Sequence, residues 1–321
     1  MNLPPANLHF SDLQPSAEDF RSAVMDGLGC SPKRLPPKFF YDEQGSRLFD
    51  AITELPEYYP TRTEIGLLRR HGQEIAERLG SRLLLIELGS GSDVKIRVLL
   101  NALHPSAYMP IDISAQHLYR SGSAIAEDFP ELQVHAVCAD YSGPLRLPEV
   151  APNSPRAAFF PGSSIGNFEP AQAAALLERI RGMVGQGGRL LIGVDLKKDA
   201  GLLDVAYNDA QGVTAAFNRN LLVRINRELD ADFDLEAFDH RAFYNAEKGR
   251  VEMHLIARSP QRVYIDGHYF DFRAGEGLHT ENSYKYNVAE FRALAEQAGY
   301  VSEKVWQDEQ NLFSLHCLRV A

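Results

Sequence analysis

The sequence predicts an α/β protein built around a doubly wound, mostly parallel sheet. Three observations support this fold class. Apolar runs alternate with amphipathic helical segments through residues 61–199, and this alternation is typical of βαβ units. The run LLLIEL at 83–88 is short and apolar, as expected for a central parallel strand buried on both faces. After residue 200 the pattern changes to short strands in hairpins, which indicates a separate α+β region.

The elements of the predicted core follow one another in a regular order. A helix is expected from Thr61, because Thr61 and Glu64 form a capping-box signature just after Pro60. One later helix is expected to have Ser114 as its cap. Another is expected to have Pro170 in its first turn and Gly185 just past its end. The predicted strands and helices alternate as LLLIEL, KIRVLLNAL, AYMPIDI, SAQHLYRSGSAIAEDF, LQVHAVCADY, RAAFFPG, EPAQAAALLERIRGMV and GRLLIGVDL.

The remaining segments predict a second, discontinuous domain. Residues 1–60 combine one helix with a Pro- and aromatic-rich segment, LPPKFFYDEQGSRLFDAITELPEYYP, which is either a loop clamped onto a core or a lid over a ligand. We expect this segment to pack with residues 200–286, where two helices precede several short strands. A final helix and hairpin can rejoin the parallel sheet. We therefore expect a Rossmann-like core of 61–199 plus 287–321 and an α+β cap of 1–60 plus 200–286.

Composition excludes several partners. Lys and Arg total 33 and Asp and Glu total 43, and the net charge of −10 is spread along the chain, whereas nucleic-acid binding needs concentrated basic residues. The three cysteines are far apart, and none of the ten histidines has metal-ligand spacing. No export signal and no membrane-spanning apolar run is evident. We expect a cytoplasmic monomer with no nucleic-acid, membrane or metal partner.

Glycine and acidic residues follow the first two predicted strands. Ligands of open parallel sheets bind beyond the carboxyl ends of the strands, where strand order reverses. Gly89 and Gly91 permit a tight turn there, but Val94 occupies the third glycine position of a dinucleotide fingerprint. Asp112 follows Gly89 by 23 residues and ends the second strand, where a carboxylate can bind both ribose hydroxyls.

The next three strands end in the same way. Asp140 and Tyr141 end the third strand, a loop with Asn167 follows the fourth, and Asp195 ends the fifth. Each acid alone could be a helix N-cap. Together they favour a nucleoside ligand without phosphate, such as S-adenosylmethionine, over NAD.

Long motifs identify a family. The motifs are LPPKFFYDEQGSRLFDAITELPEYYPTRTE, ELGSGSDVK, FFPGSSIGNFEP, DLKKD, AYNDAQGVTAAFNRN and HTENSYKY. Nearly end to end, the chain resembles the histidine-specific Nα-methyltransferases of ergothioneine biosynthesis. The resemblance implies a methyltransferase that converts L-histidine to its trimethylated betaine, hercynine, with a discontinuous substrate-binding domain. It also implies that the methyl donor, S-adenosylmethionine, is held by Gly89, Lys95, Asp112, Asp140 and Tyr141.

The resemblance also implies an amino-acid site. Its polar residues are Tyr58, Asn167 and Tyr207 for the amino acid and Glu281 and Ser283 for the imidazole; Tyr41, Phe217 and Met253 complete the wall. This residue chemistry suits histidine, because Asn both donates and accepts and Glu281 can accept from an imidazole N–H. Tyr41 is the candidate acceptor for the amine proton, with Asn167 as its catalytic partner. Asn282, between the imidazole contacts, is the visible variation.

Three alternatives remain open. The enzyme could methylate another amino acid such as tryptophan, although an apolar residue at position 281 would then be expected. The protein could be a non-catalytic S-adenosylmethionine-binding regulator, but it would not need a complete amino-acid pocket. Glu281 could also merely pair with Lys285 at the surface.

Overall fold

The computed structural model describes residues 5–13, 17–91, 93–150 and 154–321. The chain forms two compact units. The first comprises Met1–Gln14, Pro60–Lys197 and Tyr284–Ala321, and the second comprises Pro15–Tyr59 and Lys198–Ser283. No helix in the described ranges is both long and apolar enough to cross a membrane.

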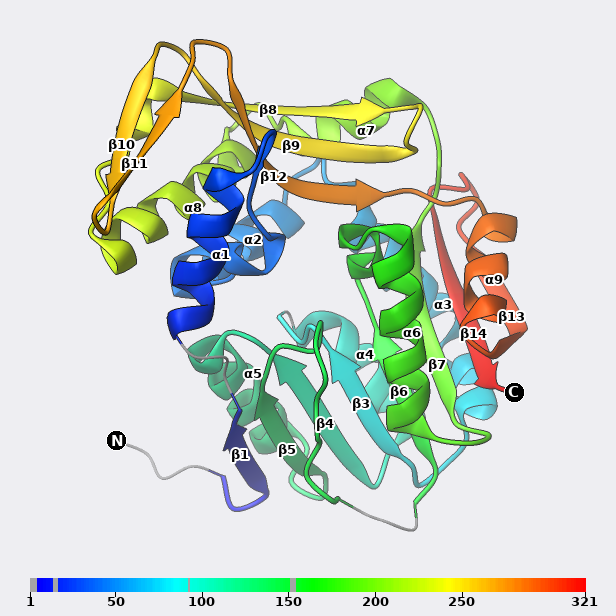
Figure 1. Cartoon of the computed structure of the whole chain (residues 1–321). Coiled ribbons are helices and arrows are strands. Elements are labelled where there is room, and N and C mark those ends of the chain that lie inside the picture. The colour runs from blue at the N-terminus through cyan, green and yellow to red at the C-terminus, as the bar shows by residue number, and fades with distance from the viewer. Residues whose placement is uncertain (1–4, 14–16, 92, 151–153) are drawn as a thin grey trace. The chain divides into compact units, whose positions relative to one another are not determined.

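The first unit contains an eight-stranded sheet in the order β1-β5-β4-β3-β6-β7-β14-β13 (Figure 1). Its strands are β1 (Leu8–Asp12), β3 (Leu84–Leu88), β4 (Ala107–Asp112), β5 (Gln133–Cys138), β6 (Arg156–Phe160), β7 (Arg189–Asp195), β13 (Tyr300–Gln307) and β14 (Phe313–Val320). The six strands from β1 to β7 in this order are parallel, and β14 runs antiparallel to both β7 and β13. The C-terminal hairpin therefore rejoins the sheet as the sequence predicts.

Helices cover both faces of this sheet. They are α3 (Tyr59–Leu79), α4 (Asp93–Leu103), α5 (Ala115–Asp128), α6 (Pro170–Val184) and α9 (Val288–Gln297), with a short 3₁₀ helix, η2 (Ser164–Asn167). Leu176 of α6 and Phe291 of α9 belong to one buried cluster on the sheet. Leu68 of α3, Leu99 of α4 and Ile125 of α5 belong to another. The predicted doubly wound α/β fold is confirmed.

Strand order reverses in the middle of this sheet. The chain runs outward from β3 through β4 to β5 and then returns to place β6 on the other side of β3. The carboxyl ends of β3 and β6 therefore diverge into loops at the point where open α/β sheets bind ligands. The residues that follow these two strands are positioned by the topology of the sheet.

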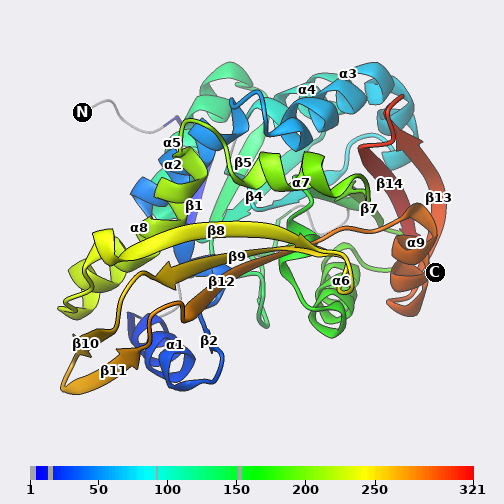
Figure 2. The same cartoon turned by 90° about the horizontal axis from the view of Figure 1, so that it is seen from above.

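The second unit contains a four-stranded sheet in the order β2-β12-β9-β8 and a separate β10–β11 hairpin. Its strands are β2 (Lys33–Arg34), β8 (Phe238–Asn245), β9 (Arg250–Ala257), β10 (Gln261–Ile265), β11 (His268–Phe272) and β12 (Gly277–Tyr284). Its helices are α1 (Ala17–Gly29), η1 (Pro37–Phe40), α2 (Glu43–Thr53), α7 (Ala200–Tyr207), α8 (Val213–Leu229) and η3 (Leu235–Ala237). Figure 2 shows β8, β9 and β12 side by side, with the hairpin beyond one end.

The aromatic N-terminal segment packs inside the second unit. The rings of Phe40 and Phe217 stack with centroids 4.6 Å apart, and Phe49 lies 6.0 Å from Phe217. Tyr58 makes an edge contact with Tyr207 at 6.2 Å. Because Phe217 lies on α8 and Tyr207 on α7, the expectation that this segment packs with residues 200–286 is confirmed.

Several elements differ from the sequence expectations. Residues Leu8–Asp12 form β1 and pair with β5 at the edge of the first unit's sheet, although we expected all of 1–60 in the cap. The polar strand β12 was not predicted, because GLHTENSY has no apolar alternation. Helix α3 begins at Tyr59, so Thr61 lies inside it and the Thr61–Glu64 capping box is wrong. Ser114 is the N-cap of α5, but its side chain makes no capping hydrogen bond.

Long-range hydrogen bonds explain why β1 forms where its sequence gives little signal. The side-chain amide of Asn7 donates to the carbonyl oxygens of Ala126, Phe129 and Leu132. These bonds fix the chain beside β5 just before the strand begins. A half-exposed strand held in this way depends on its neighbours more than on its own apolar pattern.

Candidate active site

The glycine turn after β3 brings together two residues that were predicted to bind the methyl donor. Gly89 has a φ of +72°, a left-handed conformation that glycine adopts without steric strain. A side chain at this position would place its Cβ only 3.3 Å from the hydroxyl oxygen of Tyr141. Gly89 therefore allows the turn and the close approach of Tyr141, which follows β5.

Asp112 and Asp140 are held by the turns that follow their strands. Oδ1 of Asp112 accepts from the backbone N–H of Ser114 at 2.8 Å, and Oδ1 of Asp140 accepts from Ser142 at the same distance. Burial raises the pKa of Asp112, while the Ser114 N–H and the charge of His117 act in the opposite direction. Burial, with the nearby carboxylates of Asp112 and Asp140, also raises the pKa of Tyr141 well above its usual range. Tyr141 therefore stays a neutral hydroxyl at physiological pH.

Lys95 lies in the first turns of α4 and is buried. Its ammonium group is 2.7 Å from Oε2 of Glu64, a residue of α3. The same carboxylate accepts from the backbone N–H of Gly162 after β6. Sequence patterning indicated only a capping role for Glu64, so its ion pair with Lys95 was missed.

Glu87 is a second acidic residue that sequence reasoning did not single out. It lies in the central strand β3, where burial raises its pKa to about 8 despite a hydrogen bond from the Tyr108 hydroxyl and the charge of Lys95. Within the described residues, its Oε1 atom is buried and has no hydrogen-bond partner. An acidic residue inside an apolar run was the available sequence signal.

Asn167 ends η2, in the loop that follows β6. This loop is tied to the end of β7, because Oγ of Ser163 accepts from the backbone N–H of Asp195 at 2.9 Å. The carboxylate of Asp195 pairs with Lys285 at 2.6 Å, and both side chains are 1% exposed. Glu281 is also buried, so the alternative that places Glu281 at the surface is wrong.

Within the second unit, several residues that were predicted to bind the amino-acid substrate contact one another. The Tyr207 hydroxyl donates to Oγ of Ser283 at 2.8 Å, and Tyr207 contacts Tyr58. Tyr41 lies edge-on to Phe217 at 5.7 Å. Phe49, which sequence reasoning missed, contacts Tyr41, Tyr58 and Phe217 and joins these pairs into one aromatic cluster.

Two more predicted residues lie on neighbouring strands of the same unit. Met253 is in β9 and is 1% exposed, and Glu281 is in β12 and is 9% exposed. Oγ1 of Thr280 donates to the Met253 carbonyl at 3.1 Å and thereby couples the strands at this level. The unit therefore carries aromatic, thioether and carboxylate groups in a buried setting.

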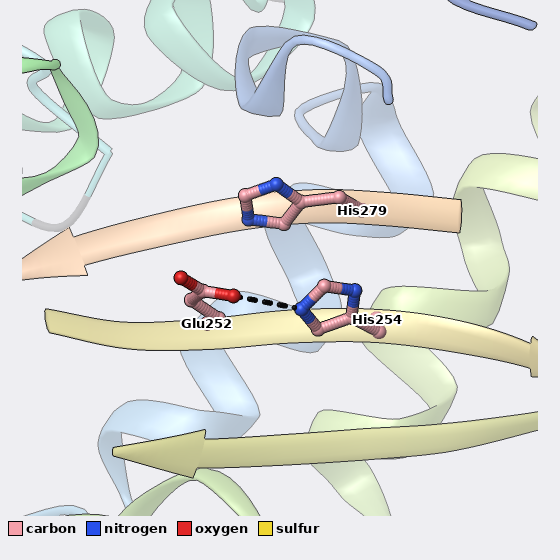
Figure 3. A group of neighbouring side chains, drawn as sticks. All are labelled: Glu252, His254 and His279. Carbon is pink, nitrogen blue, oxygen red and sulfur yellow. Dashed lines mark hydrogen bonds and ion pairs between the residues drawn. The ribbon is translucent and has the colours of Figure 1, made fainter. Parts of the chain in front are cut away.

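Among the described residues, one group of ligand-type side chains is close enough to hold a metal ion (Figure 3). The ligand atoms of Glu252, His254 and His279 all lie within 4.8 Å of one another. Burial lowers the pKa of both histidines, which favours neutral rings. Burial opposes ionisation of Glu252, but hydrogen bonds from Arg250 and His254 hold its pKa at about 2.

In this group the two imidazole rings are stacked face to face. The rings of His254 and His279 are 4.6 Å apart and only 15° from parallel. Imidazole lone pairs lie in the ring plane, so one ring must rotate before both can face one ion. Arg250 already pairs with Oε1 of Glu252 at 2.8 Å, and His254 Nε2 lies 3.1 Å from Oε2. On the other side of the stack, Nε2 of His279 donates to the backbone carbonyl of Glu281 at 3.0 Å.

Comparison with known proteins places this chain in a family. Residues 20–320 match the model of the family described as histidine-specific methyltransferase, SAM-dependent. The chain belongs to the histidine-specific methyltransferase family. It is 44% identical over 322 residues to a histidine N-alpha-methyltransferase of Mycolicibacterium smegmatis, with 98% of each chain covered.

Two further relatives of this methyltransferase are similar over most of the chain. A histidine N-alpha-methyltransferase of Mycobacterium tuberculosis is 43% identical over 301 residues, covering 92% of this chain and 93% of that one. Ergothioneine biosynthesis protein 1 of Neurospora crassa is 31% identical over 308 residues, which cover 89% of this chain and 33% of the larger protein. The family resemblance in the motifs is confirmed.

As a member of this family, the protein is an enzyme that uses S-adenosylmethionine as its methyl donor. The residues that were predicted to bind the donor lie at the strand ends of the first unit. Asp112 offers a carboxylate at the end of β4, and the Gly89 turn brings the backbone close to the Tyr141 hydroxyl. The incomplete glycine pattern also suits a nucleoside that carries no phosphate.

Proposed function

We propose that this protein methylates the α-amino group of L-histidine three times to form Nα,Nα,Nα-trimethylhistidine, or hercynine, a step of ergothioneine biosynthesis. The observation that carries the proposal is the buried Tyr207–Ser283 hydrogen bond in the unit that also contains buried Glu281. A pocket with buried polar partners rejects ligands that leave them unpaired, which favours an imidazole over an apolar ring.

The first unit binds the methyl donor in this proposal. Gly89, Lys95, Asp112, Asp140 and Tyr141 are the proposed contacts. Asp112 accepts from the ribose hydroxyls, and Asp140 and Tyr141 hold the adenine. The donor supplies an electrophilic methyl group on its sulfonium, so no covalent nucleophile or metal is needed.

The second unit is the proposed substrate-binding domain. Tyr58 and Tyr207 bind the amino and carboxylate groups of the amino acid. Glu281 accepts from the imidazole N–H and Ser283 provides a second polar contact. Phe217 and Met253, which are buried apolar side chains, and Tyr41 form the wall.

Methyl transfer needs an unprotonated amine whose lone pair is aligned with the methyl group. Alignment contributes much of the rate enhancement in such a displacement. Asn167 orients the amine through its amide oxygen, and Tyr41 receives or relays the proton. We place the reaction in the cytoplasm and expect the enzyme to act as a monomer without nucleic-acid or membrane partners; the three free cysteines suit a reducing compartment.

A substrate panel tests the proposal. Purified protein is incubated with S-adenosylmethionine and each of histidine, tryptophan, phenylalanine and tyrosine, and products are measured by mass spectrometry. We expect products one, two and three methyl groups heavier than histidine, with higher kcat/KM than for the other amino acids. A higher kcat/KM for tryptophan than for histidine would mean that tryptophan, not histidine, is the substrate. Donor binding without transfer to any amino acid would favour a non-catalytic regulator.

A further inference from the structure

Glu64 is a completely buried carboxylate in the first unit, with 0% of its side chain exposed. Its Oε2 atom lies 2.7 Å from Nζ of Lys95 and accepts from the backbone N–H of Gly162 at 2.9 Å. Its Oε1 atom receives the same N–H at 3.2 Å. A buried carboxylate destabilises a protein unless charge and hydrogen bonds compensate, and here both are supplied.

The surrounding backbone leaves space for this carboxylate. Gly193 lies in the middle of β7, and a Cβ at that position would overlap Oε1 of Glu64 and crowd the ring of Phe313. A Cβ at Gly162 would lie 3.4 Å from Nζ of Lys95. Helix α3, helix α4, β7 and the turn after β6 therefore meet at a single carboxylate.

The two groups that Glu64 holds come from the two sides of the point where strand order reverses. Lys95 follows β3 through the glycine turn, and Gly162 follows β6. Along the sheet edge the order is Asp140 after β5, Asp112 at the end of β4, Gly89 after β3 and Gly162 after β6. A donor whose adenine and ribose bind at β5 and β4 must extend its amino-acid end toward β3 and β6.

We propose that Glu64 is a positioning residue for the amino-acid end of S-adenosylmethionine. It holds the Lys95 ammonium and the Gly162 turn in the arrangement that receives the donor's carboxylate. In a variant without the Glu64 carboxylate, Lys95 loses its ion-pair partner. The flexible Lys95 side chain is then expected to leave this position. The inference rests on the proposed placement of the nucleoside at Asp112 and Asp140.

Two ligands separate this role from a purely structural one. S-adenosylhomocysteine carries the amino-acid end, whereas 5′-methylthioadenosine has the same nucleoside without it. Glu64→Gln keeps the size and an oxygen acceptor for Gly162 but removes the charge that fixes Lys95. By titration calorimetry we expect S-adenosylhomocysteine affinity to fall about tenfold or more, and 5′-methylthioadenosine affinity to change less than about twofold.

Matched controls come from the same helix and the same site. Glu74 also lies on α3 and pairs with Arg78 and Lys304, so Glu74→Gln should leave both affinities unchanged. Asp112→Ala should weaken both ligands if the nucleoside is placed as proposed. If Asp112→Ala weakens neither, the donor placement is wrong, and this outcome is distinct from failure of the Glu64 role.

The proposal is overturned if Glu64→Gln weakens both ligands equally, because Glu64 then only maintains the fold. It is also overturned if neither ligand is affected. Should Glu64→Gln fail to fold, Glu64→Asp carries the test, since it keeps the charge and shortens the side chain by one methylene. For that variant, S-adenosylhomocysteine must lose more affinity than 5′-methylthioadenosine. In kinetics, KM for S-adenosylmethionine should rise while KM for histidine stays within about twofold.

Discussion

The hydroxyl of Tyr207 donates to Oγ of Ser283 across 2.8 Å, and both side chains are buried in the second unit. Tyr207 lies on α7 and Ser283 on β12. The bond therefore joins two elements that are far apart in the sequence. The Ser283 hydroxyl oxygen is the acceptor of this bond.

Removing this hydrogen bond should weaken histidine binding. Ser283→Ala loses one neutral contact and leaves the Tyr207 hydroxyl buried without this partner, so we expect KM for histidine to rise roughly 2- to 10-fold. Tyr207→Phe combined with Ser283→Ala should cost less than the sum of the two single changes, because the residues are in contact. Steady-state kinetics of the three variants measure this coupling; strictly additive effects would contradict it.

Asp112→Ala should weaken binding of S-adenosylhomocysteine. A hydrogen bond to a charged group contributes about 1.5–3 kcal/mol, so calorimetry should show a loss of roughly 10- to 150-fold. Ser114→Ala is the matched control, because the Ser114 backbone N–H that bonds Asp112 is retained. Unchanged affinity in the Asp112 variant, with circular dichroism showing an intact fold, would remove Asp112 from the site.

Glu281→Ala should raise KM for histidine strongly and narrow the preference over tryptophan and phenylalanine. Removing a hydrogen bond to a charged group costs about 1.5–3 kcal/mol of binding free energy for histidine. The apolar rings of tryptophan and phenylalanine are expected not to use Glu281, so their binding should change less. Glu281→Gln retains an acceptor oxygen and should lose less. Competition assays measured by mass spectrometry give the ratios of kcat/KM. An unchanged preference in Glu281→Ala would show that Glu281 has a structural role only.

Gly193→Ala should destabilise the first unit by about 1–3 kcal/mol, because its new Cβ overlaps the Glu64 carboxylate. Gly66, on the helix that carries Glu64, has open space where a Cβ would be added. Gly66→Ala should therefore be neutral or stabilise the protein by up to about 1 kcal/mol. Urea denaturation of the two variants compares them directly; equal stability would show that the space around Glu64 adapts freely.

Glu87 should make stability fall as pH rises. Its folded-state pKa is raised from the ordinary value of 4.5 to about 8, mainly by burial. Between these values the folded protein holds a proton that the unfolded chain releases, so unfolding free energy decreases with pH, by at most about 1.4 kcal/mol per pH unit. Below pH 4.5 and above pH 8 this contribution is constant.

Glu87→Gln isolates that contribution. The amide keeps an acceptor for the Tyr108 hydroxyl but has no proton to lose. The stability difference between the variant and the parent protein, measured by denaturation from pH 5 to pH 9, should grow in favour of the variant as pH rises. A difference that stays constant across this range would contradict the raised pKa.

The sequence by itself determined the core of the first unit and the residues at its strand ends. Strand β3 could be predicted from local sequence, because a strand buried on both faces needs a continuous apolar run. Helix α6 could also be predicted, because Pro170 marks its start and Gly185 its end. Parallel topology then places Asp112 and Asp140 at one sheet edge. The motifs identified the family through stretches that alternation alone does not explain.

Only the tertiary structure decided which distant groups meet. Glu64 looked like a capping residue, yet its carboxylate binds Lys95 and Gly162, which are contributed by other elements. The polar strand β12 carries no apolar pattern and is stabilised by bonds such as Thr280 to Asn218 of α8. Periodicity reports the face that a residue presents, whereas buried polar groups are stabilised by partners far away in sequence. Their roles therefore depend on the folded chain.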